Sequence, residues 1–170
     1  MAPAASRRIA EAQTILKDLG LPKEQHNERA GLTLLALLDV RPSAAWATAR
    51  SPRIGVTPIM DYVAKHYRKR WAPNTRETVR RFTLHQFEQA GLVIANPDAP
   101  RRPTNSPKFC YQIGPRALRV IRAYGTNAWQ RLLRRYLADR PTLVAKYAQA
   151  RKMQRVAVTT ATGARFTLTP

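Results

Sequence analysis

Apolar residues near the start of the chain recur at helical spacing. They repeat every three or four positions between residues 6 and 19, and Gly20 follows, which predicts a helix that ends there. A second helix is expected over residues 23–39, after Leu21-Pro22. Its leucine-rich block, Leu32–Leu38, is apolar nearly all round, so we expect this helix to lie at the centre of the core.

The next part of the chain predicts two helices on either side of a short turn. Residues 40–56 are rich in proline and glycine and should be irregular, with room for a short helix at residues 44–49. Thr57-Pro58 combines an N-cap residue with proline at the first helical position, which starts a helix that runs to about residue 70. Asn74 is a good N-cap for the following helix, which should run to residue 90 and stop at Gly91.

Two apolar stretches of β type then flank a basic loop. Residues 92–95 and 109–113 are the expected strands, and residues 96–108 between them contain four prolines and three basic residues. The expected order of elements is helix, helix, turn, helix, strand, basic loop and strand, which is the order of a winged helix-turn-helix. The predicted fold class is therefore mainly α with a small β part, built on a winged helix-turn-helix core.

The rest of the chain predicts additional helices and a final hairpin. Helices are expected at residues 115–124 and 127–139, and a third after Pro141. Residues 156–160 and 165–169 flank a turn that contains glycine, which favours a β-hairpin or a linker. The chain then divides into an N-terminal helix (1–22), the winged helix-turn-helix domain (23–113), a helical extension (114–155) and this last segment (156–170).

The charge of the chain restricts the possible classes of function more than the predicted elements do. The 170 residues include 30 Lys+Arg against 10 Asp+Glu, a net charge of +20, and +16 of it lies between residues 61 and 155. These bases are spread over several helices and a loop rather than along one amphipathic helix, so a long nucleic-acid backbone fits better than a membrane surface. No apolar run reaches membrane-spanning length. Cys110 is the single cysteine, which suits a reducing cytoplasm.

The helix that begins at Asn74 is the expected recognition helix. At 100° per residue, one arc holds Val79, Phe82, Thr83, Gln86, Phe87 and Ala90 and should pack on the preceding helix. The opposite side carries the candidate base-reading residues Thr75, Arg76, Glu77, Thr78, Arg80, Arg81 and His85. Arginine reads guanine in the major groove through a bidentate pair, and Arg81 is the best placed. Glu77 is equally suited to accept from cytosine or to cap its own helix.

A second group of residues suits the DNA backbone. It comprises Lys69, Arg70 and Asn74 in the turn, and Arg101, Arg102, Asn105 and Lys108 in the loop that would form the wing. Contacts of this kind position a protein on DNA more than they specify sequence. The alternative interpretation, a solvated charged face, is disfavoured by the basic loop that follows the helix. On a later helix, Arg131, Arg134 and Arg135 are compatible with either a phosphate-facing stripe or the rim of a dimer.

Catalytic and metal-binding patterns are not found in the sequence. A metal-dependent phosphodiesterase needs clustered carboxylates, and Pro97-Asp98 is not followed by the remaining acids and lysine of a nuclease motif. The histidines have no partner at ligand spacing. The sequence also lacks a phosphate-binding loop and a nucleophile elbow. This chain alone is therefore not expected to be an enzyme, and no catalytic or metal residue is assigned.

The segment Pro73-Asn-Thr-Arg-Glu-Thr-Val-Arg-Arg81 is the most specific motif of the sequence. Together with further blocks between about residue 12 and residue 155, it resembles the N-terminal domain of BsuBI/PstI-type restriction endonucleases. The resemblance implies a winged-helix DNA-recognition domain, followed in the family by a metal-dependent nuclease domain that this chain lacks. The other blocks are Asn27-Glu-Arg29, Leu32–Leu38, Gly55–Asp61, Leu84–Phe87, Asn105–Lys108 and Tyr111–Ile113.

The resemblance implies sequence-specific binding of double-stranded DNA as the recognition half of a type II restriction endonuclease. It also implies short palindromic targets, often read by homodimers, and magnesium for the missing nuclease domain. The last residues would then lead toward that domain. A stand-alone winged-helix regulator or a nucleoid-type DNA-binding protein is the alternative. An RNA-binding module is weaker, because the sequence has no sheet motif with stacking aromatic residues.

Overall fold

The computed structural model describes the backbone of residues 2–161 and the side chains of residues 2–153. Helix α1 (Pro3–Asp18) packs on α2 (Glu28–Leu38), and every residue of α2 from Ala30 to Leu38 is buried. The prediction that the leucine-rich helix is central is thus confirmed. Gly31 allows the close approach of the two helices, because a Cβ atom there would lie 3.3 Å from the carbonyl oxygen of Ile9.

The expected helix over residues 23–39 is interrupted. Lys23–Gln25 form a short 3-10 turn (η1), and α2 begins only after Asn27, whose side chain accepts a hydrogen bond of 2.8 Å from the backbone N–H of Ala30. The N-cap competes with continuation of the helix, because an asparagine side chain satisfies a backbone N–H that has no helical partner.

The two helices of the predicted helix-turn-helix are present. After the short 3-10 helix η2 (Trp46–Thr48), α3 spans Val56–Tyr67, with Gly55 as its N-cap and Arg68, in the left-handed region with φ 55°, as its C-cap. The predicted N-cap Thr57 and the predicted end near residue 70 are therefore wrong, because Thr57 lies in the first turn and the left-handed Arg68 ends the helix. The second helix runs without interruption from residue 75 to residue 89. Its three parts are α4 (Thr75–Val79), the π-helical turn η3 (Arg80–Leu84) and α5 (His85–Gln89).

The π turn changes which residues of this helix face the core. A π turn has more residues per turn than an α-helix, so positions after it are rotated relative to a wheel drawn at 100° per residue. Phe82 is 56% exposed, although the wheel put it on the packing side, and Leu84 is fully buried. The packing residues are Val79, Thr83, Leu84, Phe87 and Ala90.

A small sheet follows the second helix. Strands β1 (Val93–Ala95) and β2 (Tyr111–Ile113) pair antiparallel, with Val93 opposite Ile113. On the other edge of β2, Ile54 forms an isolated antiparallel bridge with Tyr111. The segment just before α3 therefore joins the sheet, and β2 lies between this segment and β1.

Two helices complete the described fold. Helix α6 (Pro115–Arg122) is short, and α7 (Trp129–Ala161) is long and continues through Pro141. The expected end of the helix before Pro141 is therefore wrong. A proline removes one backbone hydrogen bond, and here buried Tyr136 and Leu143 hold the helix against the domain on both sides of it.

The expected strand at residues 156–160 is also wrong, because these residues continue α7. No glycine or proline lies between Pro141 and Gly163, so nothing in this part of the sequence interrupts the helix before Ala161. The second expected strand, residues 165–169, and most of the turn before it lie outside the described residues. The expected limits at 22/23, 113/114 and 155/156 remain a prediction.

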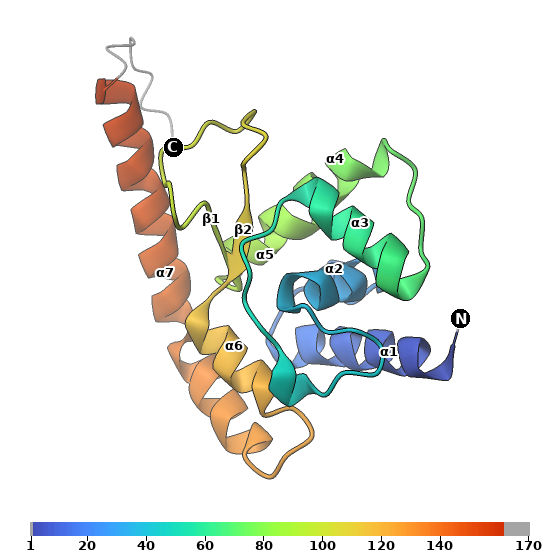
Figure 1. Ribbon diagram of the computed structural model, residues 1–170. Coiled ribbons are helices and arrows are strands. Elements are labelled where there is room, and N and C mark those ends of the chain that lie inside the picture. Colours follow the sequence, from blue (N-terminus) through green and yellow to red (C-terminus); the bar gives the residue numbers. More distant parts are fainter. Residues whose placement is uncertain (1, 162–170) are drawn as a thin grey trace.

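Figure 1 shows how these parts are arranged. Helices α1, α2 and α3 form one side of the molecule, and α7 runs along the other side next to α6 and the hairpin. Gly91, with φ +77°, ends α5 where α7 passes, and a Cβ atom there would lie 3.2 Å from Cγ2 of Val144. The beginning of α4 and the loop between β1 and β2 lie at the same end of the molecule. None of the described helices is long and apolar enough to span a membrane.

Candidate nucleic-acid interface

A groove of about 850 Å³ separates the second helix of the helix-turn-helix from the loop between β1 and β2. We call this loop, residues 96–110, the wing loop. The floor of the groove is the start of α3, and its two walls are the first turns of α4–η3 and the wing loop. The lining residues are Arg53, Gly55–Pro58, Arg76, Glu77, Arg80 and Thr104–Cys110.

Basic side chains from both walls line this groove. Nε of Arg76 donates a hydrogen bond of 3.1 Å to Oγ1 of Thr57, which orients the rest of the guanidinium group and leaves it exposed. Lys108 is exposed on the opposite wall. Arg53 at the floor lies 3.7 Å from a carboxylate oxygen of Asp98. A negatively charged chain that enters the groove would therefore meet positive charge on both sides.

Glu77 organises two arginines of the second helix. Nε of Arg80 donates to Oε2 of Glu77 at 3.2 Å, and a second, shorter bond joins the other nitrogen and oxygen of the same pair. Nε of Arg81 lies 3.9 Å from the same carboxylate. The hydrogen bonds from Arg80 lower the pKa of Glu77. Asn74 makes no side-chain capping bond, and the carboxylate of Glu77 accepts hydrogen bonds from Arg80.

The outward side of the second helix carries polar and basic groups. Arg81 and His85 are exposed, and Thr75 and Thr78 are half-buried. Glu88, three residues after His85, is largely covered, and Arg151 of α7 lies 3.9 Å from its carboxylate. Burial raises the pKa of Glu88.

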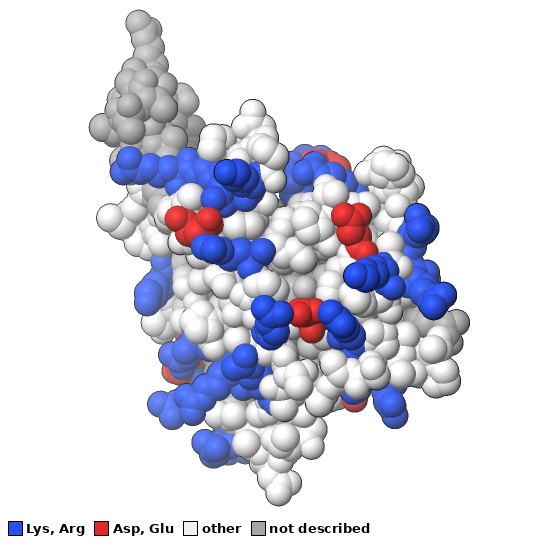
Figure 2. All heavy atoms as spheres, in the orientation of Figure 1, with Lys and Arg blue, Asp and Glu red and all other residues white. Residues whose placement is uncertain are grey.

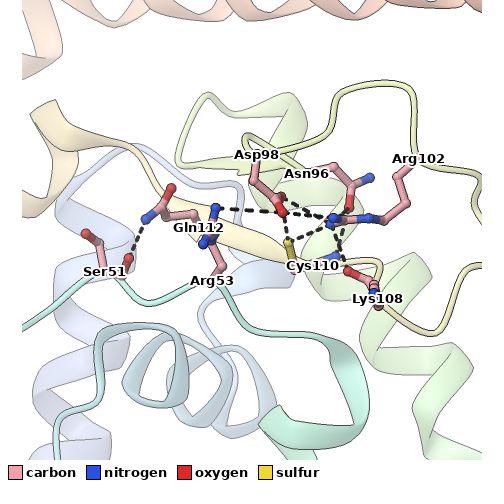
Figure 3. A network of polar contacts seen from close by, with 8 residues as sticks. All are labelled: Ser51, Arg53, Asn96, Asp98, Arg102, Lys108, Cys110 and Gln112. Carbon is pink, nitrogen blue, oxygen red and sulfur yellow. Dashed lines mark hydrogen bonds and ion pairs between the residues drawn. The ribbon is translucent and has the colours of Figure 1, made fainter.

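The wing loop is fixed by a compact polar network (Figure 3). Nη1 of Arg102 donates to the carbonyl of Lys108 at 2.9 Å, and its Nη2 donates to a carboxylate oxygen of Asp98 at 2.8 Å. The side-chain oxygen of Asn96 accepts from the backbone N–H of Cys110 at 3.0 Å and from Arg102 at 3.2 Å. Asn96 has φ +47° and is buried. These bonds join the two ends of the loop to its middle.

The network changes the interpretation of Arg102. Its side chain is only 13% exposed, and its guanidinium group forms hydrogen bonds within the loop. Arg102 therefore stabilises the conformation of the wing loop. The bonds from Arg102 also lower the pKa of Asp98 to about 2, so the pair stays ionised across the physiological pH range. Arg101, Asn105 and Lys108 remain exposed, and they are the wing-loop residues from the sequence prediction that are open to a ligand.

The turn between α3 and α4 holds the remaining predicted residues. Lys69 pairs with Glu28 at the start of α2, at 2.9 Å, which ties this turn to the central helix. Arg70 and Asn74 are exposed. Sequence reasoning missed Arg53 and Thr57 as groove residues. Thr57 was interpreted only as an N-cap, although it precedes a proline next to the segment that pairs with β2.

A separate basic surface lies on α6 and α7. Figure 2 shows Lys and Arg side chains gathered over the part of the molecule where these helices lie. Arg116, Arg119 and Arg135 line a cleft of about 240 Å³ between the two helices. Arg116 pairs with Asp139. This surface includes Arg131, Arg134 and Arg135.

A helix-turn-helix defines a class of DNA-binding domains, and the comparisons agree with this class. A family model described as "BsuBI/PstI restriction endonuclease HTH domain" matches residues 6–145. The chain belongs to the BsuBI/PstI restriction endonuclease family, as its sequence motifs indicated.

Individual relatives support the same assignment. The chain is 49% identical to the type II restriction enzyme BsuBI of Bacillus subtilis over 95% of its length, and 36% identical to AplI of Arthrospira platensis over 92%. The solved structure of SdaI restriction endonuclease matches it with a TM-score of 0.75 and 35% identity, over 85% of this chain and 46% of that one. The chain covers 51% of BsuBI and 48% of AplI, so it spans about half the length of these relatives.

Magnesium, which the resemblance implies for the nuclease domain, does not fit the described part of this chain. Among these residues, no group of three His, Cys, Asp or Glu side chains lies close enough to hold a metal ion. The acids near the groove, Glu77 and Asp98, are each paired with arginine. We therefore derive no metal-dependent step for this chain.

Proposed function

We propose that this chain is a winged-helix domain that binds double-stranded DNA sequence-specifically, as the recognition half of a type II restriction endonuclease. The sheet supports the winged-helix interpretation. A segment before α3 pairs with β2, and β2 pairs with β1, so the wing loop follows the second helix as it does in winged helices. Cleavage and its magnesium requirement then belong to the remainder of the longer protein, in the cytoplasm.

The observation that carries this proposal is the groove between the second helix and the wing loop. Its walls present Arg76 from one side and Lys108 from the other, and the groove is open to solvent. Arginine and lysine that converge on a groove from two elements suit the phosphate backbone of a duplex. The neighbouring outward side of the helix then faces the bases of the adjacent major groove.

The proposed contacts fall into two groups. Arg81 and His85 are the leading base readers, with Thr78, Arg80 and Glu77 beside them; in particular, Glu77 holds Arg80 in a fixed orientation. The backbone contacts come from groove, turn and wing-loop residues that are open to solvent or line the groove. These are Lys69, Arg70, Asn74, Thr75, Arg76, Arg101, Asn105 and Lys108. Arg102 is assigned to holding the wing loop, in place of a DNA contact.

Selection from a random duplex library at about 150 mM salt tests the proposal, because nonspecific phosphate binding is already weakened there. The 170-residue chain should enrich one short site, and a palindromic site would support binding as a homodimer. The variant Arg80→Gln/Arg81→Gln should lose this enrichment. The matched variant Arg7→Gln/Lys17→Gln, with both changes on the exposed face of α1, should retain it. Failure of the unaltered chain to enrich any site would refute sequence-specific recognition.

A further inference from the structure

Phe82 is an exposed aromatic residue in the middle of the second helix. Its side chain is 56% exposed, while its neighbours on the outward side, Arg81 and His85, are polar. In the described part of the chain, the other exposed large apolar residues are Leu137 at 38% and Met153 at 63%, both on α7. A phenylalanine between arginine and histidine on a helix that faces DNA requires an explanation.

The π turn explains why Phe82 points outward. In η3, the backbone carbonyl of Phe82 accepts a hydrogen bond of 2.7 Å from Nε2 of Gln25, which is only 3% exposed. At the next residue, Oγ1 of buried Thr83 accepts a bond of 3.1 Å from Nε of Arg29. Gln25 lies in η1, between α1 and α2, and Arg29 lies in the first turn of α2, so both hold the π turn from outside the helix. Such turns are frequent at functional sites.

A hollow of about 530 Å³ lies beside the Phe82 ring. It is lined by the second helix on one side and by residues 22–29 on the other, including one acid, Glu24, and one base, Arg29. The hollow therefore offers no net positive charge to a phosphate group, whereas a base edge is uncharged and needs none. The charges and the ring therefore favour an apolar base contact at this position over a contact with the DNA backbone. The lining residues are Pro22, Glu24, Gln25, Asn27, Arg29, Phe82 and Gln86.

We propose that Phe82 is a base-contacting residue that packs against the C5-methyl group of a thymine in the major groove. The methyl group is the one apolar feature that the major groove presents, and phenylalanine is among the side chains that contact it. Gln25 and Arg29 are positioning residues, because they stabilise the π turn that turns Phe82 toward the DNA. The inference rests on the proposed function, since it concerns the same DNA-binding surface.

Replacement of thymine by uracil tests this contact, because uracil differs from thymine only by the missing methyl group. Each thymine of the selected site is replaced in turn, and the dissociation constant of each duplex is measured by fluorescence anisotropy at fixed salt. For the unaltered chain, one thymine per half-site should show a loss of about fourfold, which corresponds to ~0.8 kcal/mol for one buried methyl-sized group. Phe82→Ala should bind the thymine and uracil duplexes equally.

Three further variants separate a base contact from a general loss of folding. Gln25→Met and Thr83→Val each remove one of the bonds to the π turn, and both should reduce the uracil effect while helical circular dichroism is unchanged. Leu137→Ala removes an exposed apolar side chain on α7 and should keep the full fourfold effect. A positioning role predicts this selective loss, whereas a merely structural role predicts weaker binding to both duplexes alike.

The outcomes distinguish the inference from the proposed function. If the unaltered chain enriches no site, the proposed function fails. If it enriches a site that has no thymine, or shows no uracil effect, or if Phe82→Ala keeps that effect, only the inference is overturned. If Phe82→Ala leaves every DNA affinity unchanged but lowers self-association in sedimentation, Phe82 belongs to an interface with a second copy, and the base contact is refuted.

Discussion

The groove between the second helix and the wing loop makes a quantitative prediction about salt dependence. Arg76→Gln and Lys108→Gln together remove one exposed positive charge from each wall and leave the polar network of the wing loop intact. Arg80 and Arg53 also line the groove, but Glu77 already pairs with the first and Asp98 lies near the second. The double variant therefore removes the two groove cations that no carboxylate holds among the described residues.

The size of the effect follows from counterion release. Each phosphate contact contributes about −0.9 to the slope of log affinity against log salt, so loss of two contacts should make the slope shallower by about 1.8. Between 50 mM and 200 mM salt, the ratio of the DNA affinity of the unaltered chain to that of the variant should therefore change roughly twelvefold. Because phosphate contacts carry no sequence information directly, the variant should weaken selected and unrelated duplexes to similar extents.

Fluorescence anisotropy titrations at four or more salt concentrations would measure this slope. Arg7→Gln/Lys17→Gln is the matched control, since it removes the same net charge from the exposed face of α1. If the control changes the slope as much as the groove variant does, binding depends on net charge and not on the groove. An unchanged slope in the groove variant would remove both residues from the interface.

Other substitutions test single residues. Arg81→Ala should cost ~1–3 kcal/mol on the selected site, with little effect on unrelated DNA, in competition titrations. Arg102→Met should speed amide hydrogen exchange across residues 96–110, whereas Arg101→Gln should leave exchange unchanged. Burial raises the pKa of Glu88, so its folded form holds a proton more tightly than the unfolded chain does, and stability falls as pH rises through that window. Glu88→Gln should therefore raise the denaturation midpoint at neutral pH, and the gain should disappear in acid.

Local sequence patterns predicted the elements where one strong signal dominates. The central helix could be predicted because Leu32–Leu38 is apolar in every direction, and it is buried throughout. The two strands and the loop between them followed from short β-type segments around prolines. The start of α2 was missed because Lys23–Gln25 are compatible with a helix. Only the capping bond of Asn27 decides where α2 begins.

The features that distant residues determine could not be predicted. The π turn depends on Gln25 and Arg29, which lie 57 and 54 residues from their partners in the chain. No helical wheel contains this information, so Phe82 was assigned to the wrong side. Likewise, Pro141 remains within α7 because packing on both sides of it outweighs the loss of one hydrogen bond.

The pairing of Asp98 with Arg102 in the wing loop is compatible with their spacing in the sequence. Asp98 and Arg102 are four residues apart, a spacing at which a carboxylate and a guanidinium group can pair in a tight turn. The prediction that Arg101 and Arg102 both contact the DNA backbone did not take this spacing into account. The structure separates the two adjacent arginines, because one is bonded within the loop and the other is exposed.

Most of the few acidic residues pair with basic side chains in the structure. Seven of the ten acids in the sequence form ion pairs with Lys or Arg. Glu77 contacts Arg80 and Arg81, and Asp98 contacts Arg102 and lies near Arg53. Each of these acids thus orients two guanidinium groups while it cancels only one positive charge. The surface remains strongly basic, and Glu77 holds Arg80 in place, which would reduce the entropy that Arg80 loses in the proposed contact with DNA.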